Sequence, residues 1–295
     1  MRDDFPDPRE LQERAARRLQ RREEVRRRVR RQRRFAGAAV LVPLVGLMLC
    51  LTGGGGGGRG AGSFHMTAAG SRRSWKPHTG PVPILEYHVL GRPQTEVAYP
   101  ELYVPRASFR KQMDWLEQQS YEAVTLEQVE EAWYHGGTLP PKPMVISFDD
   151  GYRPQYTFAM PELRKHGWAG VLNLKAEGSD LYTSNVEAML EAGWELAAHT
   201  IHHSDLTTLE GGALEEEVAG SREILQREYG VPVKNFCYPA GRFNSTVIAA
   251  VEAAGYVGAT TEIPGMATKD HPYELARIEV LGSWTVGDLA EAMRG

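Results

Sequence analysis

The chain has 295 residues, of which 42% are hydrophobic, so it can form one large domain or two small ones with a sizeable core. Its formal net charge of −4 hides an asymmetry, because residues 1–34 hold 14 Arg, no Lys and seven acidic residues. The remaining 20 basic and 31 acidic side chains give the rest of the chain a net charge of −11, which argues against a nucleic-acid partner. The two cysteines, Cys50 and Cys237, are too few for a disulfide framework or a cysteine-based metal site.

Residues 35–52, "FAGAAVLVPLVGLMLCLT", contain no charged residue and follow an arginine-rich stretch. As an α-helix this segment would be about 27 Å long, close to the thickness of the hydrocarbon core of a bilayer. The positive-inside rule places residues 1–34 in the cytoplasm, where the arginines can contact anionic headgroups. We expect a single-pass membrane anchor at 35–52. The alternative is a signal peptide, whose cleavage would release the protein outside the cell.

Residues 53–80 begin with a glycine run and are expected to form a flexible linker. From residue 81 onward, short apolar runs alternate with amphipathic stretches. Strands are expected over 82–88, 143–148, 169–174, 194–198, 235–240, 257–262 and 277–281. Helices are expected over 108–119, 126–137, 158–167, 184–193, 212–230, 244–255 and 285–293, with Ser108, Ser184 or Asn185, and Asn244 or Ser245 as caps. This β-then-α repetition predicts an α/β domain over 81–295, with about seven parallel strands in a barrel.

Polar side chains follow the predicted strands. His88 ends the strand "VPILEYH", Asp149 and Asp150 follow "PMVISF", and His199 follows "WELAA". The stretch "YPAG" lies at the end of the strand "NFCYPA". In parallel β/α barrels, the catalytic groups come from several strands and lie at the carboxyl ends of the strands. We therefore expect these residues to share one site.

The stretch "HTIHH" places His199 and His203 four residues apart, where both imidazoles can bind one cation. A carboxylate would complete a set of three ligands and leave one position open for water. The adjacent Asp149 and Asp150 repel each other, which raises a pKa or requires a cation nearby. Either motif alone also fits a structural role, as a hydrogen-bonded histidine pair or a capped turn. Together they predict that one aspartate binds a metal and the other acts as a base.

The motifs "SFDDG", "HTIHH" and "YPAG", in this order, resemble those of the polysaccharide deacetylase family, also called the NodB-homology domain. The resemblance extends from about residue 81 to the C-terminus. It implies a distorted (β/α) barrel that hydrolyses N- or O-acetyl groups on sugars with a divalent metal, usually zinc. It also implies that Asp149 is the general base and that Asp150, His199 and His203 are the metal ligands.

The third motif departs from the family pattern. Most members have Arg-x-Pro-Tyr-Gly, whereas "CYPAG" places Cys237 at the arginine and Ala240 at the tyrosine. The arginine that orients the base is therefore missing from this motif. The backbone N–H of Ala240 can still serve as an oxyanion donor, because that role needs no side chain.

The late Leu-x-His motif of the family is also absent, since no histidine follows His271. The arrangement resembles instead the branch of the poly-N-acetylglucosamine deacetylases, in which an early "YH" supplies the general acid. This resemblance assigns the acid to His88. Two alternatives stay open: His88 packs beneath the barrel mouth, or His271 is the acid.

These observations predict a metal-dependent hydrolase, with Zn²⁺ as the expected ion. It would remove N-acetyl groups from N-acetylglucosamine units of an extracellular or cell-wall polysaccharide. One alternative is an O-acetyl esterase on the same fold. Another is a catalytically weak polysaccharide-binding module, because the motif arginine is missing. A third assigns the function to the arginine-rich tail and treats the outer domain as its cargo.

Overall fold

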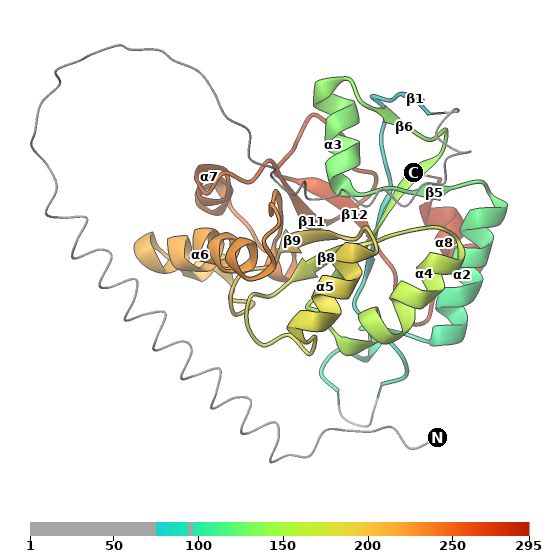
Figure 1. Cartoon of the computed structure of the whole chain (residues 1–295), viewed down its shortest axis with the longest axis horizontal. Coiled ribbons are helices and arrows are strands. Elements are labelled where there is room, and N and C mark those ends of the chain that lie inside the picture. The colour runs from blue at the N-terminus through green and yellow to red at the C-terminus, as the bar shows by residue number, and fades with distance from the viewer. Residues whose placement is uncertain (1–74, 94–96, 295) are drawn as a thin grey trace, which may run out of the picture. The chain divides into compact units, whose positions relative to one another are not determined.

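The computed structural model describes residues 75–93 and 97–294, which all fall within the compact unit Gly62–Gly295 (Figure 1). The predicted basic tail, the membrane anchor at 35–52 and most of the linker lie outside the described residues. Strand β1, Lys76–Pro77, pairs antiparallel with β6, Thr138–Leu139, so regular structure begins before residue 81. Within 75–93 and 97–294, no helix combines the length and apolarity needed to cross a membrane.

Seven parallel strands form a closed barrel at the centre of the domain. Each strand pairs with the next in chain order, and the first strand pairs with both the second and the last. The strands are β2 (Ile84–Tyr87), β7 (Pro143–Asp149), β8 (Val171–Leu174), β9 (Glu195–Ala198), β10 (Asn235–Cys237), β11 (Gly258–Pro264) and β12 (Leu275–Glu279). The structure confirms the predicted α/β barrel of about seven parallel strands.

Irregular pairing distorts the barrel. Strand β10 pairs with β9 at a single register position, and the β11–β12 register shifts between Thr260 and Pro264. A further short strand, β5 (Glu122–Ala123), pairs in parallel with the first residues of β7. Strands β3 (Val89–Leu90) and β4 (Tyr103–Val104) form a separate parallel pair just after the end of β2.

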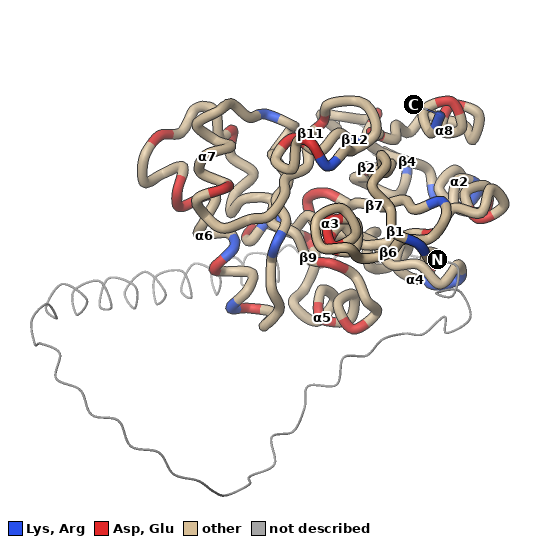
Figure 2. The backbone as a smooth tube through the Cα atoms, turned by 90° about the horizontal axis from the view of Figure 1, so that it is seen from above, with Lys and Arg blue, Asp and Glu red and all other residues tan. Residues whose placement is uncertain are grey.

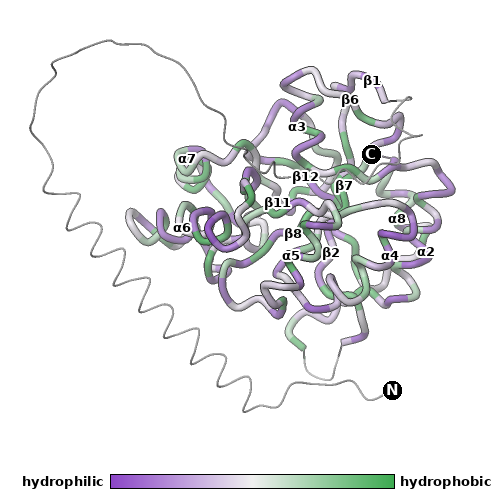
Figure 3. The backbone as a smooth tube through the Cα atoms, in the orientation of Figure 1, coloured by the Kyte–Doolittle hydropathy of each residue, from purple (hydrophilic) through white to green (hydrophobic). Residues whose placement is uncertain are grey.

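Helices surround the barrel because alternate residues of each strand face outward (Figure 1). Phe148 and Leu172 face outward into the main core, whereas Val145 and Val171 belong to a second core inside the barrel. Figure 3 shows hydrophobic residues along β7 and hydrophilic residues along α6, and Figure 2 shows acidic residues recurring on α5 and α6. The helices are α2 (Arg106–Gln118), α3 (Leu126–His135), α4 (Met160–Lys165), α5 (Thr183–Glu191), α6 (Gly211–Tyr229), α7 (Ser245–Ala253) and α8 (Val286–Ala292).

Of the predicted helix caps, one of the two candidates for α7 was right and the others were wrong. Asn244 caps α7 by accepting a hydrogen bond from the N–H of Val247, as expected. Ser108 was wrong as a cap, because α2 begins at Arg106, directly after Pro105. Ser184 and Asn185 were also wrong as caps. Helix α5 begins at Thr183, and Asn185 lies within its first turn and accepts from the N–H of Tyr182.

The two ends of the barrel have different roles. At the amino end, α3 covers the opening, where the N–H of Glu127 donates to the side chain of Glu195, the first residue of β9. At the carboxyl end, the strands lead into short turns rather than a covering helix. One is the 3₁₀ turn Pro239–Gly241 after β10, and another is the π-helical turn Gln155–Ala159 after β7. The polar strand-end residues gather at this carboxyl end.

Candidate active site at the carboxyl end of the barrel

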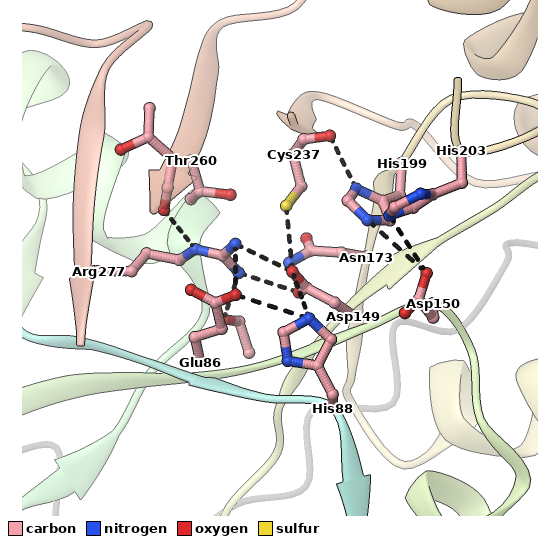
Figure 4. Close-up of polar contacts among 12 residues, drawn as sticks. Glu86, His88, Asp149, Asp150, Asn173, His199, His203, Cys237, Thr260 and Arg277 are labelled. Atoms are coloured by element: carbon pink, nitrogen blue, oxygen red, sulfur yellow. Dashed lines mark hydrogen bonds and ion pairs between the residues drawn. The ribbon is translucent and has the colours of Figure 1, made fainter. Parts of the chain in front are cut away.

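The two adjacent aspartates diverge at the end of β7. Asp149 is the last residue of the strand, faces the barrel interior and is only 1% exposed. Asp150 has a left-handed backbone, with φ of 74°, which turns its side chain toward a different set of partners. Figure 4 shows the carboxylate of Asp149 directed at an arginine and that of Asp150 at two histidines. The turn therefore gives the two carboxylates separate environments.

Asp150, His199 and His203 form a group whose ligand atoms all lie within 4.8 Å of one another. Oδ1 of Asp150 lies 3.9 Å from Nε2 of His199 and 3.6 Å from Nε2 of His203 (Figure 4). Nδ1 of His199 donates to the carbonyl of Cys237 at 2.8 Å, which leaves Nε2 with a free lone pair facing Asp150. Burial lowers the pKa of both histidines, so the neutral form that a metal requires is favoured.

This donor set fits a zinc ion. Two imidazole nitrogens and one carboxylate oxygen are common zinc ligands, and bonds of about 2.0–2.2 Å in tetrahedral geometry separate ligand atoms by roughly 3.3–3.6 Å. The Nε2–Oδ1 separations of 3.6 and 3.9 Å are close to that range. The ammonium of Lys175 lies 3.4 Å from Oδ1 of Asp150, which shows that this carboxylate already attracts a cation. His202 lies apart from the set and contacts Glu177 and Glu217.

Arg277, on β12, was missed by the sequence analysis. Its guanidinium donates from Nη1 to Oδ1 and from Nη2 to Oδ2 of Asp149, both at 2.9 Å, as a bidentate pair (Figure 4). Its Nε donates to the carbonyl of Thr261 at 2.7 Å. The motif position Cys237 lies beside the same carboxylate, with Sγ 3.4 Å from Oδ2. A lone arginine in the otherwise apolar and acidic stretch "LARIEV" was the available signal.

The electrostatics keep Asp149 ionised. Burial alone would raise its pKa, but Arg277, and then His199 and His88, hold the pKa well below its usual value. Asn173 also donates to Oδ1 at 2.7 Å. The side chain of Arg277 is 0% exposed, and burial opposes its charge, yet Asp149 keeps the pKa of the guanidinium well above its usual value. The pair therefore forms a fixed carboxylate inside the barrel.

His88 follows β2 and lies at the edge of this cluster. Its Nε2 is 4.0 Å from Oδ2 of Asp149 and 3.7 Å from Oε1 of Glu86, and its side chain is 11% exposed. The buried amide of Gln155 donates to the backbone carbonyls of His88 and Asp149, at 3.0 and 2.6 Å. Gln155 thus ties the end of β2 to the end of β7, a contact that the sequence did not reveal.

Glu86 is a second buried carboxylate next to Arg277. Its Oε1 lies 3.1 Å from Nη2 of Arg277, and both of its oxygens lack a hydrogen bond among the described residues. Burial raises the pKa of Glu86 well above its usual value, and Arg277 only partly offsets this. One guanidinium therefore faces two carboxylates and binds Asp149 in the better geometry.

The structure separates the two candidates for the general acid. His271 lies in the loop that precedes β12, and the carbonyl of the next residue, Pro272, accepts from the N–H of Ala259 near the start of β11. His271 is therefore at the amino end of the barrel, opposite to Asp149, and its assignment as the acid was wrong. Of the two candidates, His88 is the one that lies near Asp149.

Ala240 lies in the 3₁₀ turn after β10 and has a left-handed backbone, with φ of 50°. Asp150, Thr200 and His203 also have positive φ, so four of the five such non-glycine residues in the described chain belong to this end of the barrel. Such conformations cost about 1–3 kcal/mol each and concentrate at functional sites. The oxyanion role of the Ala240 N–H stays a prediction.

Solved structures share this fold. The deacetylase PplD of Streptococcus pyogenes, in complex with acetate, has a TM-score of 0.68 at 23% identity and covers 73% of this chain and 99% of that chain. IcaB from Ammonifex degensii has a TM-score of 0.62 at 22% identity, over 74% of this chain and 99% of that one. At these identities the likeness shows the fold alone.

Relatives in sequence give the family. Over 96 residues, the chain is 36% identical to the poly-β-1,6-N-acetyl-D-glucosamine N-deacetylase of Escherichia coli K12, but this covers 32% of the chain and 14% of that protein. A family model described as polysaccharide deacetylase matches residues 136–259. YxkH of Bacillus subtilis, which is named after the same family, is 30% identical over 205 residues, covering 68% of this chain and 71% of YxkH. The chain therefore belongs to the polysaccharide deacetylase family.

Proposed function

We propose that this protein is a metal-dependent hydrolase that removes N-acetyl groups from N-acetylglucosamine units of a polysaccharide outside the cell. One observation carries the proposal: an arginine-held carboxylate, Asp149, lies next to a separate set of three convergent ligands, Asp150, His199 and His203. Hydrolysis of an amide with an activated water needs both a base and a site for a divalent cation, and this arrangement supplies both.

The three convergent side chains would hold the metal, and their two nitrogens and one oxygen favour Zn²⁺. When bound there, the ion supplies Lewis acidity toward the acetyl carbonyl and lowers the pKa of the attacking water. A metal held by these three protein ligands would have a further position for water. The neutral state of the two histidines, favoured by burial, suits this role.

The residues around the metal position would move the protons. Asp149, kept ionised by Arg277, accepts the proton of the water as its oxygen attacks the acetyl carbon. The N–H of Ala240 stabilises the negative charge that develops on the carbonyl oxygen. His88 then donates a proton to the departing nitrogen, because an amine anion is too basic to leave unaided. The products are acetate and a glucosamine unit.

The choice of substrate and location rests on the sequence. The similarity to the Escherichia coli poly-β-1,6-N-acetyl-D-glucosamine N-deacetylase supports an N-acetylglucosamine polymer. The uncharged segment 35–52, preceded by arginines, supports a single-pass anchor that leaves the catalytic domain outside the cytoplasm. A tethered domain suits a polymer too large to enter the cell. Release of the domain by signal cleavage is the alternative.

The structure weakens one rival and leaves another to experiment. The missing motif arginine favoured a catalytically weak binding module, but Arg277 supplies a guanidinium to Asp149 from another strand. An O-acetyl esterase would use the same site with less need for an acid, because an alkoxide leaves more readily than an amine anion. Replacing His88 by Ala should therefore reduce amide hydrolysis far more than ester hydrolysis.

The direct test is acetate release by the full-length chain. The protein is expressed in a bacterial host, membranes are separated from the medium, and each fraction is assayed with zinc on acetylated chito-oligosaccharides. We expect acetate from the membrane fraction. Asp149→Asn should lower the rate by about 10²–10⁴-fold, because it removes the base.

The matched control is Asp270→Asn, since Asp270 is an exposed aspartate in the loop before β12, at the opposite end of the barrel. This variant should keep the wild-type rate. Activity in the medium instead of the membranes would support cleavage of the anchor. Polymer binding without acetate release, with zinc or cobalt present, would refute the hydrolase and favour the binding module.

A further inference from the structure

Residues 199–203, "HTIHH", form what we call the ligand loop, which supplies two of the three candidate metal ligands. The loop leaves β9 without regular structure, and Thr200 and His203 have φ of 63° and 61°. A left-handed backbone is unfavourable for residues with a Cβ, at about 1–3 kcal/mol each. The loop therefore needs contacts from outside to keep both histidines in place.

Glu217, on α6, provides such contacts. Its Oε2 accepts hydrogen bonds from the consecutive N–H groups of Ile201 and His202, both at 3.0 Å. Its Oε1 contacts Nδ1 of His202 at 2.5 Å. The residue is 7% exposed. One buried carboxylate thus binds the middle of the ligand loop at three points, between the two candidate ligands.

The charge of Glu217 strengthens these contacts. Burial would raise its pKa, but the hydrogen bonds from His202 and Ile201 lower it below its usual value. Glu217 is therefore ionised at neutral pH, and hydrogen bonds to an ionised acceptor are roughly twice as strong as neutral ones. The contact also holds the His202 ring between Glu217 and Glu177, whose Oε2 lies 3.3 Å from Nε2 of His202. His202 is thereby kept out of the metal position.

The other side of the ligand loop is held by backbone contacts. The N–H of Ala176 donates to the carbonyl of Thr200, and that of Glu177 to the carbonyl of Ile201, both at 3.0 Å. Within the loop, the N–H of His203 donates to Oγ1 of Thr200 at 2.8 Å. These bonds fix the carbonyl groups of Thr200 and Ile201 and the backbone N–H of His203. In the part of the chain that the structure describes, the N–H groups of Ile201 and His202 donate to Glu217 alone.

We propose that Glu217 is a positioning residue for the metal site, which fixes the ligand loop so that His199 and His203 face Asp150 before the cation binds. This inference rests on the proposed function, because it assumes a cation at these three ligands. Glu217 would touch neither the cation nor the substrate. It would act by reducing the conformational freedom that metal binding must otherwise remove. Residues behind metal ligands typically change metal affinity by about 10–100-fold.

Zinc affinity of the full-length protein tests this proposal. The chain is freed of metal with a chelator and titrated with Zn²⁺ by competition with a chromophoric ligand. We expect Glu217→Gln to raise the Kd for zinc by about 10–100-fold. The amide has the shape of the carboxylate, but it offers one acceptor oxygen and no charge to the Ile201 and His202 N–H groups. Glu217→Asp, which keeps the charge on a shorter side chain, should recover part of the affinity.

The matched control is Glu216→Gln, on the adjacent exposed residue of the same helix, which should keep the wild-type Kd. A second measurement separates positioning from damage to the fold. At saturating zinc, Glu217→Gln should recover most of the wild-type kcat, whereas Asp149→Asn should not. Circular dichroism confirms that each variant is folded before titration.

Three results would count against these proposals in different ways. A folded Glu217→Gln variant with the wild-type Kd for zinc overturns the role of Glu217. A wild-type chain that binds zinc but releases no acetate overturns the deacetylase activity, and the comparison of affinities still decides the role of Glu217. A wild-type chain that binds no divalent cation overturns both.

Discussion

Arg277 is the residue on which the proposed base depends, although it lies 128 positions from Asp149 in the chain. A fully buried guanidinium is costly unless its charge and its donors are matched. Here two N–H groups bind Asp149, Nε binds the carbonyl of Thr261, and Glu86 lies 3.1 Å from Nη2. The charge is thus compensated inside the barrel. Arg277 therefore supplies, from β12, the guanidinium that the third motif lacks, and it binds Asp149.

Replacing Arg277 by Met should therefore impair both folding and catalysis. It leaves two buried carboxylates without their cation, which should lower the free energy of unfolding by about 3–5 kcal/mol. Loss of the bidentate contact should also lower kcat/KM by about 10²-fold or more, because the base is no longer held in place. Urea unfolding and acetate release measure the two effects. Arg277→Lys keeps the charge without the fork and should fall between the wild type and Met.

Moving the arginine from position 277 to position 237 tests whether the guanidinium supports Asp149 wherever it is attached to the barrel. Sγ of Cys237 lies 3.4 Å from Oδ2 of Asp149, so a longer side chain at 237 could reach the space that Arg277 leaves. In the Arg277→Ala background, adding Cys237→Arg should restore part of the lost activity. Cys237→Ala in the same background is the control and should restore none. Equal activity of the two double variants would show that the guanidinium does not support the base.

At the scale of elements, the turn after β7 determines how the two aspartates diverge. Asp150 and Gly151 both have φ of 74°, so the chain makes two consecutive left-handed steps. A Cβ on Gly151 would lie 2.5 Å from Cδ1 of Leu174 and would also clash with Oγ of Ser179. Glycine at 151 is therefore needed both for its backbone conformation and for the close approach of the neighbouring loop.

Gly151→Ala should lower the free energy of unfolding by at least about 1–3 kcal/mol and weaken zinc binding, because Asp150 must move with the turn. The control is Gly167→Ala at the end of α4, where φ is 72° but nothing lies within 4 Å of the added Cβ. In this control the added Cβ strains the backbone but meets no neighbouring atom. The variant should therefore be less stable but keep the wild-type Kd for zinc. Equal losses of zinc affinity in both variants would contradict the role assigned to the turn.

The sequence predicted elements and strand ends well, because both follow from local pattern. Apolar runs located the barrel strands, and the parallel order placed His88, Asp149 and His199 at one end. Contacts between distant segments were not predictable in this way. No residue near Arg277 in the chain indicates that Arg277 binds Asp149. Likewise, no residue near Glu217 indicates that Glu217 binds the ligand loop. Helix starts also failed where a serine suggested a cap that the fold does not use.

At the scale of the whole molecule, the amino end of the barrel contains a second buried acidic cluster. The amide of Asn235 donates to Glu130, on α3, at 3.2 Å and to Glu195, on β9, at 2.9 Å. Burial, and then the charge of Glu195, raises the pKa of Glu130 to about 8. Burial raises the pKa of Glu195 to about 7. This cluster joins α3 to the barrel, so its protonation affects the stability of the whole domain.

The stability of the protein should therefore depend on pH through Glu130. Its pKa is near 4.5 when unfolded and about 8 when folded, so the folded state binds more protons between these values. The stabilisation is complete below about pH 4.5 and is lost as the pH rises through about 8. Glu130→Gln, which mimics the protonated acid, should lose less stability than the wild type as the pH rises, because only the contribution of Glu195 is then lost. Urea unfolding of the full-length chain between about pH 5 and 8 measures the difference between variant and wild type. Glu131→Gln, on the exposed neighbour, should follow the wild-type curve, and an identical pH slope in Glu130→Gln would refute the role of the cluster.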